Sequence, residues 1–186
     1  MKLFPVYLFL SVYALYHCVE NAPPMDMQRE QPLLVSFHPH VMNEAINEQA
    51  PVVERQDILI QASPEKVWAV LADIDRWPDW QSSVSSAKLQ GALREGAVFN
   101  WKAGGIGITS QLHTVTPSSA IGWTGKTLGA YAVHNWRIIP QAGGTLVQVE
   151  ESLQGILPKL FRKKFAADLQ KGMVKNLVEL KAAAEL

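Results

Sequence analysis

Two side chains in the second half of the sequence have the chemistry to exchange protons, His134 and Glu151. A histidine titrates near neutral pH, and a neighbouring carboxylate orients its ring and stabilises its charged form. Such a pair, facing an apolar cavity, is suited to general acid–base catalysis, with Ser110 assisting by hydrogen bonding. The same two groups can also satisfy each other's hydrogen bonds or hold the polar end of a ligand. We favour the second, non-catalytic interpretation.

Whether His134 and Glu151 lie side by side depends on how five successive strand-like segments pair with one another. They are separated by short connectors rich in glycine, proline, serine and threonine, which is typical of hairpin turns. The predicted strands are 97–103, 106–116, 120–126, 129–139 and 145–154. Since antiparallel partners keep a constant index sum, and opposite residues share a face, centring each turn predicts the register.

This register places several large side chains opposite one another. The predicted opposite pairs are Trp101 and Ile108, Leu112 and Trp123, Trp123 and His134, and His134 and Glu151. One face of the sheet is then apolar and aromatic, whereas the other is mostly polar. Four independently centred hairpins agree on one apolar face, which supports the register.

A strand over 52–61 and a capped helix precede the five runs. Ser63 is expected to cap the helix with Pro64 at its first position. Pro78 is expected to end a second short helical piece, and 85–91 to form a short strand. The first helix has one apolar face, formed by Val67, Trp68, Leu71 and Ile74.

A long helix is predicted from Pro158 to about Ala184. Its apolar residues recur every three or four positions: Leu160, Phe161, Phe165, Leu169, Met173, Leu177 and Leu180. Its basic residues lie away from this stripe: Lys159, Arg162, Lys163, Lys164, Lys171 and Lys175. A solvated face is the simpler interpretation, and peripheral contact with an anionic membrane is the functional one.

Composition excludes several classes of protein. The 186 residues include 17 Lys and Arg against 17 Asp and Glu, so we expect no nucleic-acid partner. The single cysteine, Cys18, excludes an internal disulfide and a CxxC site. His113 and His134 fall on opposite faces of the predicted sheet, and the pair in His38-Pro39-His40 has no third ligand nearby, so we expect no metal and no cofactor.

The N-terminus allows two interpretations. Lys2 precedes an uncharged, mostly apolar run that ends before Glu20, which is typical of a signal peptide or membrane anchor. Translation from Met42 is the alternative. The chain would be secreted, periplasmic or membrane-anchored in the first case and cytoplasmic in the second. The expected organisation is a hydrophobic segment over 1–22, a linker over 23–50 and one domain over 51–186.

Together these elements resemble the START-like (SRPBCC) superfamily, in its polyketide cyclase/dehydrase and lipid-transport branch. The resemblance covers roughly 44–186 and also includes the long final helix. Its motifs are Ala62-Ser63-Pro64-Glu65-Lys66-Val67-Trp68, Asp75-Arg76-Trp77-Pro78-Asp79-Trp80, His134-Asn135-Trp136 and Val149-Glu150-Glu151-Ser152. The resemblance implies an α+β helix-grip fold, in which a curved antiparallel sheet wraps around the C-terminal helix and encloses a deep cavity.

The resemblance also implies a function without giving a fixed catalytic set. We expect binding, and transport, of a hydrophobic small molecule or lipid. A cyclase or dehydratase that uses His134 and Glu151 on a polyketide-like substrate is the alternative. The expected ligand cavity comprises Trp68, Trp77, Trp80, Phe99, Trp101, Ile108, Ser110, Leu112, Trp123, His134, Trp136, Val149 and Glu151.

Overall fold

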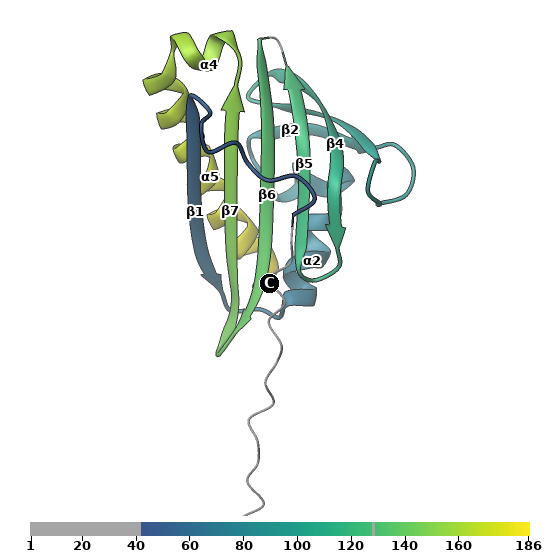
Figure 1. Ribbon diagram of the computed structural model, residues 1–186. Helices are drawn as coiled ribbons and strands as arrows, with labels where there is room; N and C mark the ends of the chain where they lie inside the picture. Colours follow the sequence, from purple (N-terminus) through teal and green to yellow (C-terminus); the bar gives the residue numbers. More distant parts are fainter. Residues whose placement is uncertain (1–41, 128) are drawn as a thin grey trace, which may run out of the picture. The chain divides into compact units, whose positions relative to one another are not determined.

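The computed structural model describes residues 42–127 and 129–186. Seven antiparallel strands form one curved, unclosed sheet in the order β1-β7-β6-β5-β4-β3-β2 (Figure 1). The strands are β1 (Val52–Ile60), β2 (Val84–Leu89), β3 (Val98–Ala103), β4 (Ile106–Thr116), β5 (Ala120–Thr127), β6 (Ala130–Gln141) and β7 (Gly144–Gln154). The helices are α2 (Pro64–Ala72), the 3-10 turn η2 (Ile74–Arg76), α3 (Trp77–Trp80), α4 (Ile156–Leu160) and α5 (Arg162–Ala184). The long α5 packs against the sheet, so the expected helix-grip α+β fold is confirmed.

The strand register agrees with the prediction at all four pairs. Ile108 lies opposite Trp101, and Trp123 lies opposite both Leu112 and His134. His134 in turn lies opposite Glu151. One departure lies beyond these pairs, where the register of β4 against β5 shifts between Leu112 and Thr114. This bulge adds one residue to β4, a feature that turn centring cannot detect.

The first helix begins as predicted, but the second does not end as predicted. The Ser63 hydroxyl accepts a hydrogen bond from the Lys66 N–H at 3.3 Å, and Pro64 opens α2. Pro78 lies in the first turn of α3 instead of ending a helix. The reason is that a first-turn residue needs no intrahelical N–H bond, so proline fits there without loss.

The C-terminal helix is interrupted once, which the apolar pattern did not predict. Phe161 separates α4 from α5 with φ −115° and ψ 37°. Leu160 and Phe161, the first two members of the predicted stripe, are 69% and 54% exposed. The stripe contacts the sheet further along, where Met173, Leu177 and Leu180 are buried.

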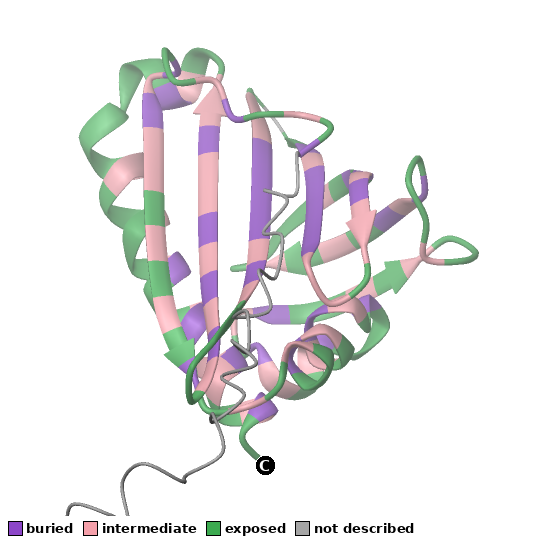
Figure 2. Cartoon of the chain, turned by 60° about the horizontal axis from the view of Figure 1, so that its bottom comes forward, coloured by how far each residue is buried: buried purple, intermediate pink, exposed green. Residues whose placement is uncertain are grey.

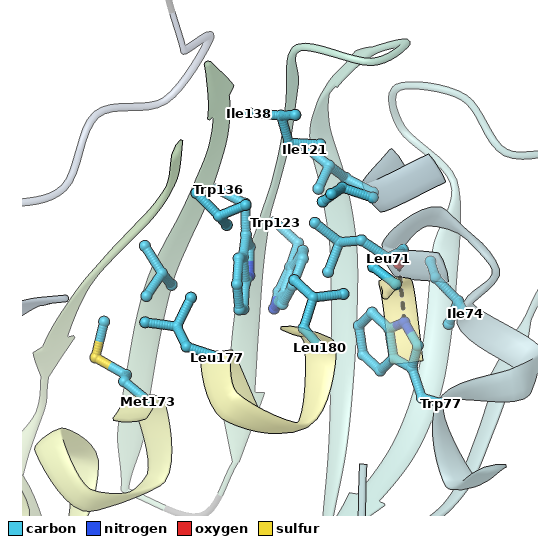
Figure 3. Packing of buried hydrophobic residues seen from close by; sticks show 14 of the residues in the cluster. Leu71, Ile74, Trp77, Ile121, Trp123, Trp136, Ile138, Met173, Leu177 and Leu180 are labelled. Atoms are coloured by element: carbon cyan, nitrogen blue, oxygen red, sulfur yellow. Dashed lines mark hydrogen bonds between the residues drawn. The ribbon is translucent and has the colours of Figure 1, made fainter. Parts of the chain in front are cut away.

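The core lies between α5, α2 and the inner, concave face of the sheet. Figure 3 shows Met173, Leu177 and Leu180 packed toward the indoles of Trp123 and Trp136. Burial of these large apolar and aromatic side chains is the main stabilising contribution of this layer. On the strands, buried and less buried residues alternate, as expected for a sheet covered on one face by a helix (Figure 2).

The outer face of the sheet is partly covered by residues 42–50, which we call the strap. Figure 1 shows the strap, in dark blue, passing in front of β7 and β6. Its Met42, Ile46 and Ala50 are 7–8% exposed. These residues belong to the stretch expected as linker. The expected segment 1–22, most of the linker and the His38-Pro39-His40 motif lie outside the described residues, and the domain boundaries stay predictions.

Candidate functional site

A cavity of about 320 Å³ lies between the inner face of the sheet and the N-terminal half of α5. Five strands and the helix contribute to its wall, and apolar groups predominate. We call it the main cavity. It is lined by Gln81, Ser83, Trp101, Ala103, Ile108, Ser110, Trp123, Gly125, Lys126, Thr127, Ala130, Ala132, His134, Glu151, Leu153, Asp168, Leu169, Gly172, Met173 and Asn176.

His134 and Glu151 form a hydrogen-bonded pair on this wall. The Nδ1–H of His134 donates to the Glu151 carboxylate, and the two side chains are 10% and 13% exposed. The imidazole also stacks on Trp123, with ring centroids 4.6 Å apart and planes 17° from parallel. Its ring orientation is therefore held from two sides, and the carboxylate is the charged group at this part of the wall.

Ser110 provides a second polar group on the same wall. It is 1% exposed, and its hydroxyl accepts a hydrogen bond from Trp101 Nε1 at 3.1 Å. On the neighbouring strand, a Cβ at Gly125 would lie 3.2 Å from the Ser110 oxygen. The glycine therefore keeps the wall recessed at this point.

The structure brings about half of the expected cavity residues to the main cavity and places the others around it. Trp101, Ile108, Ser110, Trp123, His134 and Glu151 line it. Trp77, Trp80 and Trp136 line a much smaller adjoining cavity. Phe99, Leu112 and Val149 belong to the buried core, and Trp68 packs against that core partly exposed.

Sequence reasoning missed the contribution of α5 to the main cavity. The helix presents Asp168, Leu169, Gly172, Met173 and Asn176 there. Part of this contribution could have been predicted from the sequence. Asn176 lies seven residues after Leu169, on the same face of the helix, where the other residues are apolar. A polar residue on the inward face of a helix indicates a polar partner in the interior of the protein.

The second histidine of the domain lies on the outer face. His113 Nδ1 is 2.8 Å from the hydroxyl of Thr114, and burial lowers the pKa of the imidazole. Among residues 42–127 and 129–186, no group of three or more His, Cys, Asp or Glu side chains gathers as a metal site would require. In the same part of the chain, no helix is long and apolar enough to cross a membrane.

The chain matches the family described as "Polyketide cyclase / dehydrase and lipid transport" over residues 52–185. Curated protein sequences give no match. Similar solved structures include a hypothetical protein from Helicobacter pylori, with a TM-score of 0.68 and 14% identity over 76% of this chain and 96% of that chain.

Two further solved structures have more descriptive names. An aromatase/cyclase, Zhui, from Streptomyces sp. R1128 has a TM-score of 0.63 and 16% identity, over 72% of this chain and 93% of that chain. A START superfamily protein from Mycobacterium smegmatis has a TM-score of 0.55 and 15% identity, over 72% of this chain and 94% of that chain. At these identities the likenesses show a shared fold.

Proposed function

This chain belongs to the polyketide cyclase/dehydrase and lipid transport family of the START-like superfamily, and we propose that it binds a hydrophobic small molecule or lipid in the main cavity. The observation that carries the proposal is a 320 Å³ cavity with an aromatic wall and one hydrogen-bonded pair, His134 and Glu151. This volume lies in the range of small-molecule sites, which are mostly apolar and use a few polar groups to fix orientation.

The polar groups of the main cavity are suited to orient a ligand. Glu151 accepts hydrogen bonds, and it keeps lone pairs beyond the one that His134 uses. The Ser110 hydroxyl accepts from Trp101 and can donate in turn. A ligand with an apolar body and one hydrogen-bonding end matches this wall.

Fluorescence and native mass spectrometry test the binding proposal. Oleic acid, cholesterol and quercetin are titrated while tryptophan emission is followed, because Trp101 and Trp123 line the main cavity. We expect a saturable response to at least one compound, and the same complex in the native mass spectrum. No response across the panel, with no co-purified ligand, would contradict the proposal.

A matched pair of variants locates the binding. Ala132→Phe places a ring in the main cavity, whereas Thr109→Phe places the same ring on an exposed position of β4. Binding should be lost in the first variant and retained in the second. Equal binding by both would place the ligand elsewhere.

The His134–Glu151 pair favours a second candidate function, cyclisation followed by dehydration of a polyketide-like substrate. The pair would remove a proton from a carbon between two carbonyls, and the carbanion would form a carbon–carbon bond to a third carbonyl carbon. Protonation of the resulting alkoxide, and then loss of water, would complete the step. We rank this function below binding, because mutual hydrogen bonding accounts for the pair without catalysis.

His134→Ala separates the two functions. In a cyclase, turnover of a poly-β-ketone thioester should disappear while the circular dichroism spectrum and the unfolding transition are retained. Turnover that is unchanged in this variant would exclude His134 as the catalytic base. Binding without turnover in the wild-type protein would support the carrier function.

A surface beside the main cavity supports exchange of the ligand with an anionic membrane. Ile156, Leu160 and Phe161, at the start of the C-terminal helical region, are 72%, 69% and 54% exposed. Cations surround them: Lys159, Arg162, Lys163 and Lys164 are all exposed. Apolar side chains among cations favour insertion at the boundary of an anionic bilayer. We call these seven residues the basic apolar patch.

The basic apolar patch lies near one end of the main cavity. Gly129, in the β5–β6 turn, is so close to α4 that a Cβ there would lie 3.0 Å from Leu157. Thr127 and Ala130, on either side of this turn, line the main cavity. A ligand leaving by this end would therefore emerge beside the patch.

Vesicle sedimentation tests the membrane contact. We expect binding to phosphatidylglycerol vesicles that weakens with salt, and little binding to phosphatidylcholine vesicles. Leu160→Asp together with Phe161→Asp should abolish it. Val178→Asp, at a position that is 53% exposed near the C-terminal end of α5, is the control. Equal sedimentation of both variants with the wild type would contradict the proposed contact.

A further inference from the structure

A second, much smaller cavity of about 20 Å³ adjoins the main cavity. Five residues line both cavities: Gln81, Trp101, Trp123, His134 and Asn176. A space of this size holds one water-sized oxygen and nothing larger, because about 10–15 Å³ of such volume suffices for a water molecule. The small cavity therefore cannot hold a ring or an alkyl chain.

Four residues that line the small cavity each have a buried polar atom without a hydrogen-bond partner among the described residues. These atoms are Trp80 Nε1, His134 Nε2, Trp136 Nε1 and Asn176 Oδ1. Buried polar atoms in proteins nearly always have a partner, and leaving one unpaired costs roughly as much as a lost hydrogen bond. Four such atoms, on residues that line one cavity, point to a shared partner.

The hydrogen-bonding capacity of these atoms specifies that partner. The two indole N–H groups are donors, and the Asn176 oxygen is an acceptor. His134 Nδ1–H donates to Glu151, so in the neutral imidazole Nε2 is also an acceptor. Two donors and two acceptors match an oxygen that accepts two hydrogen bonds and donates two, as in water. A ligand hydroxyl matches three of the four.

We propose that the small cavity is a hydroxyl subsite, which binds a single O–H oxygen among Trp80, His134, Trp136 and Asn176. Water is the occupant in the ligand-free protein. A hydroxyl of the ligand replaces it in the complex, and this part rests on the proposed function. The subsite pairs Nε2 of His134 while Nδ1 faces Glu151, and it selects alcohols and phenols over hydrocarbons of the same shape.

The ligand-free protein tests the subsite independently of any ligand. A crystal structure of the full chain should show an ordered oxygen within hydrogen-bond distance of His134 Nε2 and Asn176 Oδ1. Long-range ¹H–¹⁵N spectra should show His134 with Nδ1 protonated, assigned by comparison with His134→Gln. Asn176→Leu, which removes the acceptor at similar volume, should lose the ordered oxygen. Pairing of the four atoms with one another, and no ordered oxygen, would overturn the proposal.

A pair of probes distinguishes the two sources of the oxygen. In the wild type, 2-naphthol should bind roughly threefold to tenfold more tightly than naphthalene, the gain expected of one hydrogen bond. This preference should disappear in Trp136→Phe and persist in Trp68→Phe, because Trp68 lines neither cavity.

The other possible results also show whether water or the ligand supplies the oxygen in the small cavity. A crystal with the naphthol oxygen among the four atoms supports the ligand hydroxyl. An ordered water that stays in place, with no preference between the probes, supports the subsite with water as its occupant. If neither probe binds, the proposed function is weakened, whereas the ligand-free crystal still decides the subsite.

Discussion

Buried polar side chains have different surroundings on the two faces of the sheet. On the inner face, His134 pairs with Glu151 at the wall of the main cavity. On the outer face, polar side chains that are almost fully buried lie under the strap: Thr114, Asn135 and Ser152 are 0–1% exposed. Both faces bury polar groups, and on the inner face the main cavity lies beside them.

The strap provides hydrogen-bond partners for these outer polar side chains. The backbone N–H of Asn43 donates to the Thr114 hydroxyl at 2.9 Å, and that of Asn47 donates to the Ser152 hydroxyl at 3.1 Å. The Asn135 amide donates to the Glu44 carbonyl at 3.1 Å. The strap therefore pairs three of the buried polar side chains of this face, although Asn135 Oδ1 and His113 Nε2 have no partner among the described residues. On the inner face, the unpaired atoms of His134 and Asn176 belong to residues that line the main cavity. Outer-face changes should therefore affect stability, and inner-face changes should affect binding.

Two glycines of β5 give the largest expected contrast between the faces. A Cβ at Gly122 would lie 2.5 Å from His113 Cε1 and 2.6 Å from Asn135 Oδ1, on the outer face. Gly122→Ala should therefore lower the free energy of unfolding by about 1–3 kcal/mol and leave probe binding unchanged. Urea unfolding measures the first effect and the fluorescence titration the second.

Gly125→Ala is the matched inner-face variant. Its Cβ would meet Ser110 Oγ at 3.2 Å, a contact that a small shift relieves. We expect a stability loss below about 1 kcal/mol, together with weaker binding, because the methyl group enters the main cavity. A larger loss of stability in Gly125→Ala than in Gly122→Ala would contradict the contrast.

Two buried hydroxyls on β4 provide the next contrast. Thr114→Val keeps the shape of the side chain and removes the acceptor for the Asn43 N–H, so it should cost about 1–2 kcal/mol of stability. Ser110→Ala removes the inner-face acceptor of Trp101 Nε1, beside the main cavity. That variant should change probe affinity more than stability, as read from the same unfolding and titration curves. Equal effects of the two variants on affinity would contradict the separation of the faces.

Tyr131 anchors the strap at a smaller expected cost. Its hydroxyl donates to Glu44 Oε1 at 2.7 Å, and burial together with this carboxylate raises the pKa of the phenol to about 12. Tyr131→Phe should lower stability by about 0.5–1 kcal/mol at neutral pH. Since the folded state keeps the proton more tightly, wild-type stability should fall between about pH 10 and pH 12, and this fall should be smaller in Tyr131→Phe. A tyrosine absorbance titration measures the pKa directly.

The pH dependence from His113 is the smallest expected effect. Burial lowers the pKa of its imidazole below 6.5, with Glu44 and Glu95 opposing the shift and His134 adding to it. The unfolded chain therefore binds the proton more readily, and stability should fall as the pH drops below about 6.5. His113→Gln should show a shallower fall in urea midpoints measured from pH 7 to pH 5. An identical fall in both proteins would show that other groups cause it.

Local patterns were enough to predict most of the fold. Ser63 and Pro64 specify the start of α2 because capping depends on neighbours in sequence. The register that brings His134 opposite Glu151 was predictable because short turns fix the index sum of each hairpin. The apolar face of the sheet follows from the same alternation.

The tertiary structure alone decided the features that depend on contacts distant in sequence. The bulge at Leu112 and Thr114 puts His113 and Thr114 together under the strap, and no turn signal marks it. Asn176 reaches the cavities because of the way α5 lies across the sheet. By itself, the sequence determined which residues share a face wherever the strands alternate regularly, but not at the bulge of β4. How deeply each is buried, and which atoms remain unpaired beside a cavity, depended on the packing of helix and strap against that sheet, because burial and hydrogen-bond pairing are properties of the assembled layers.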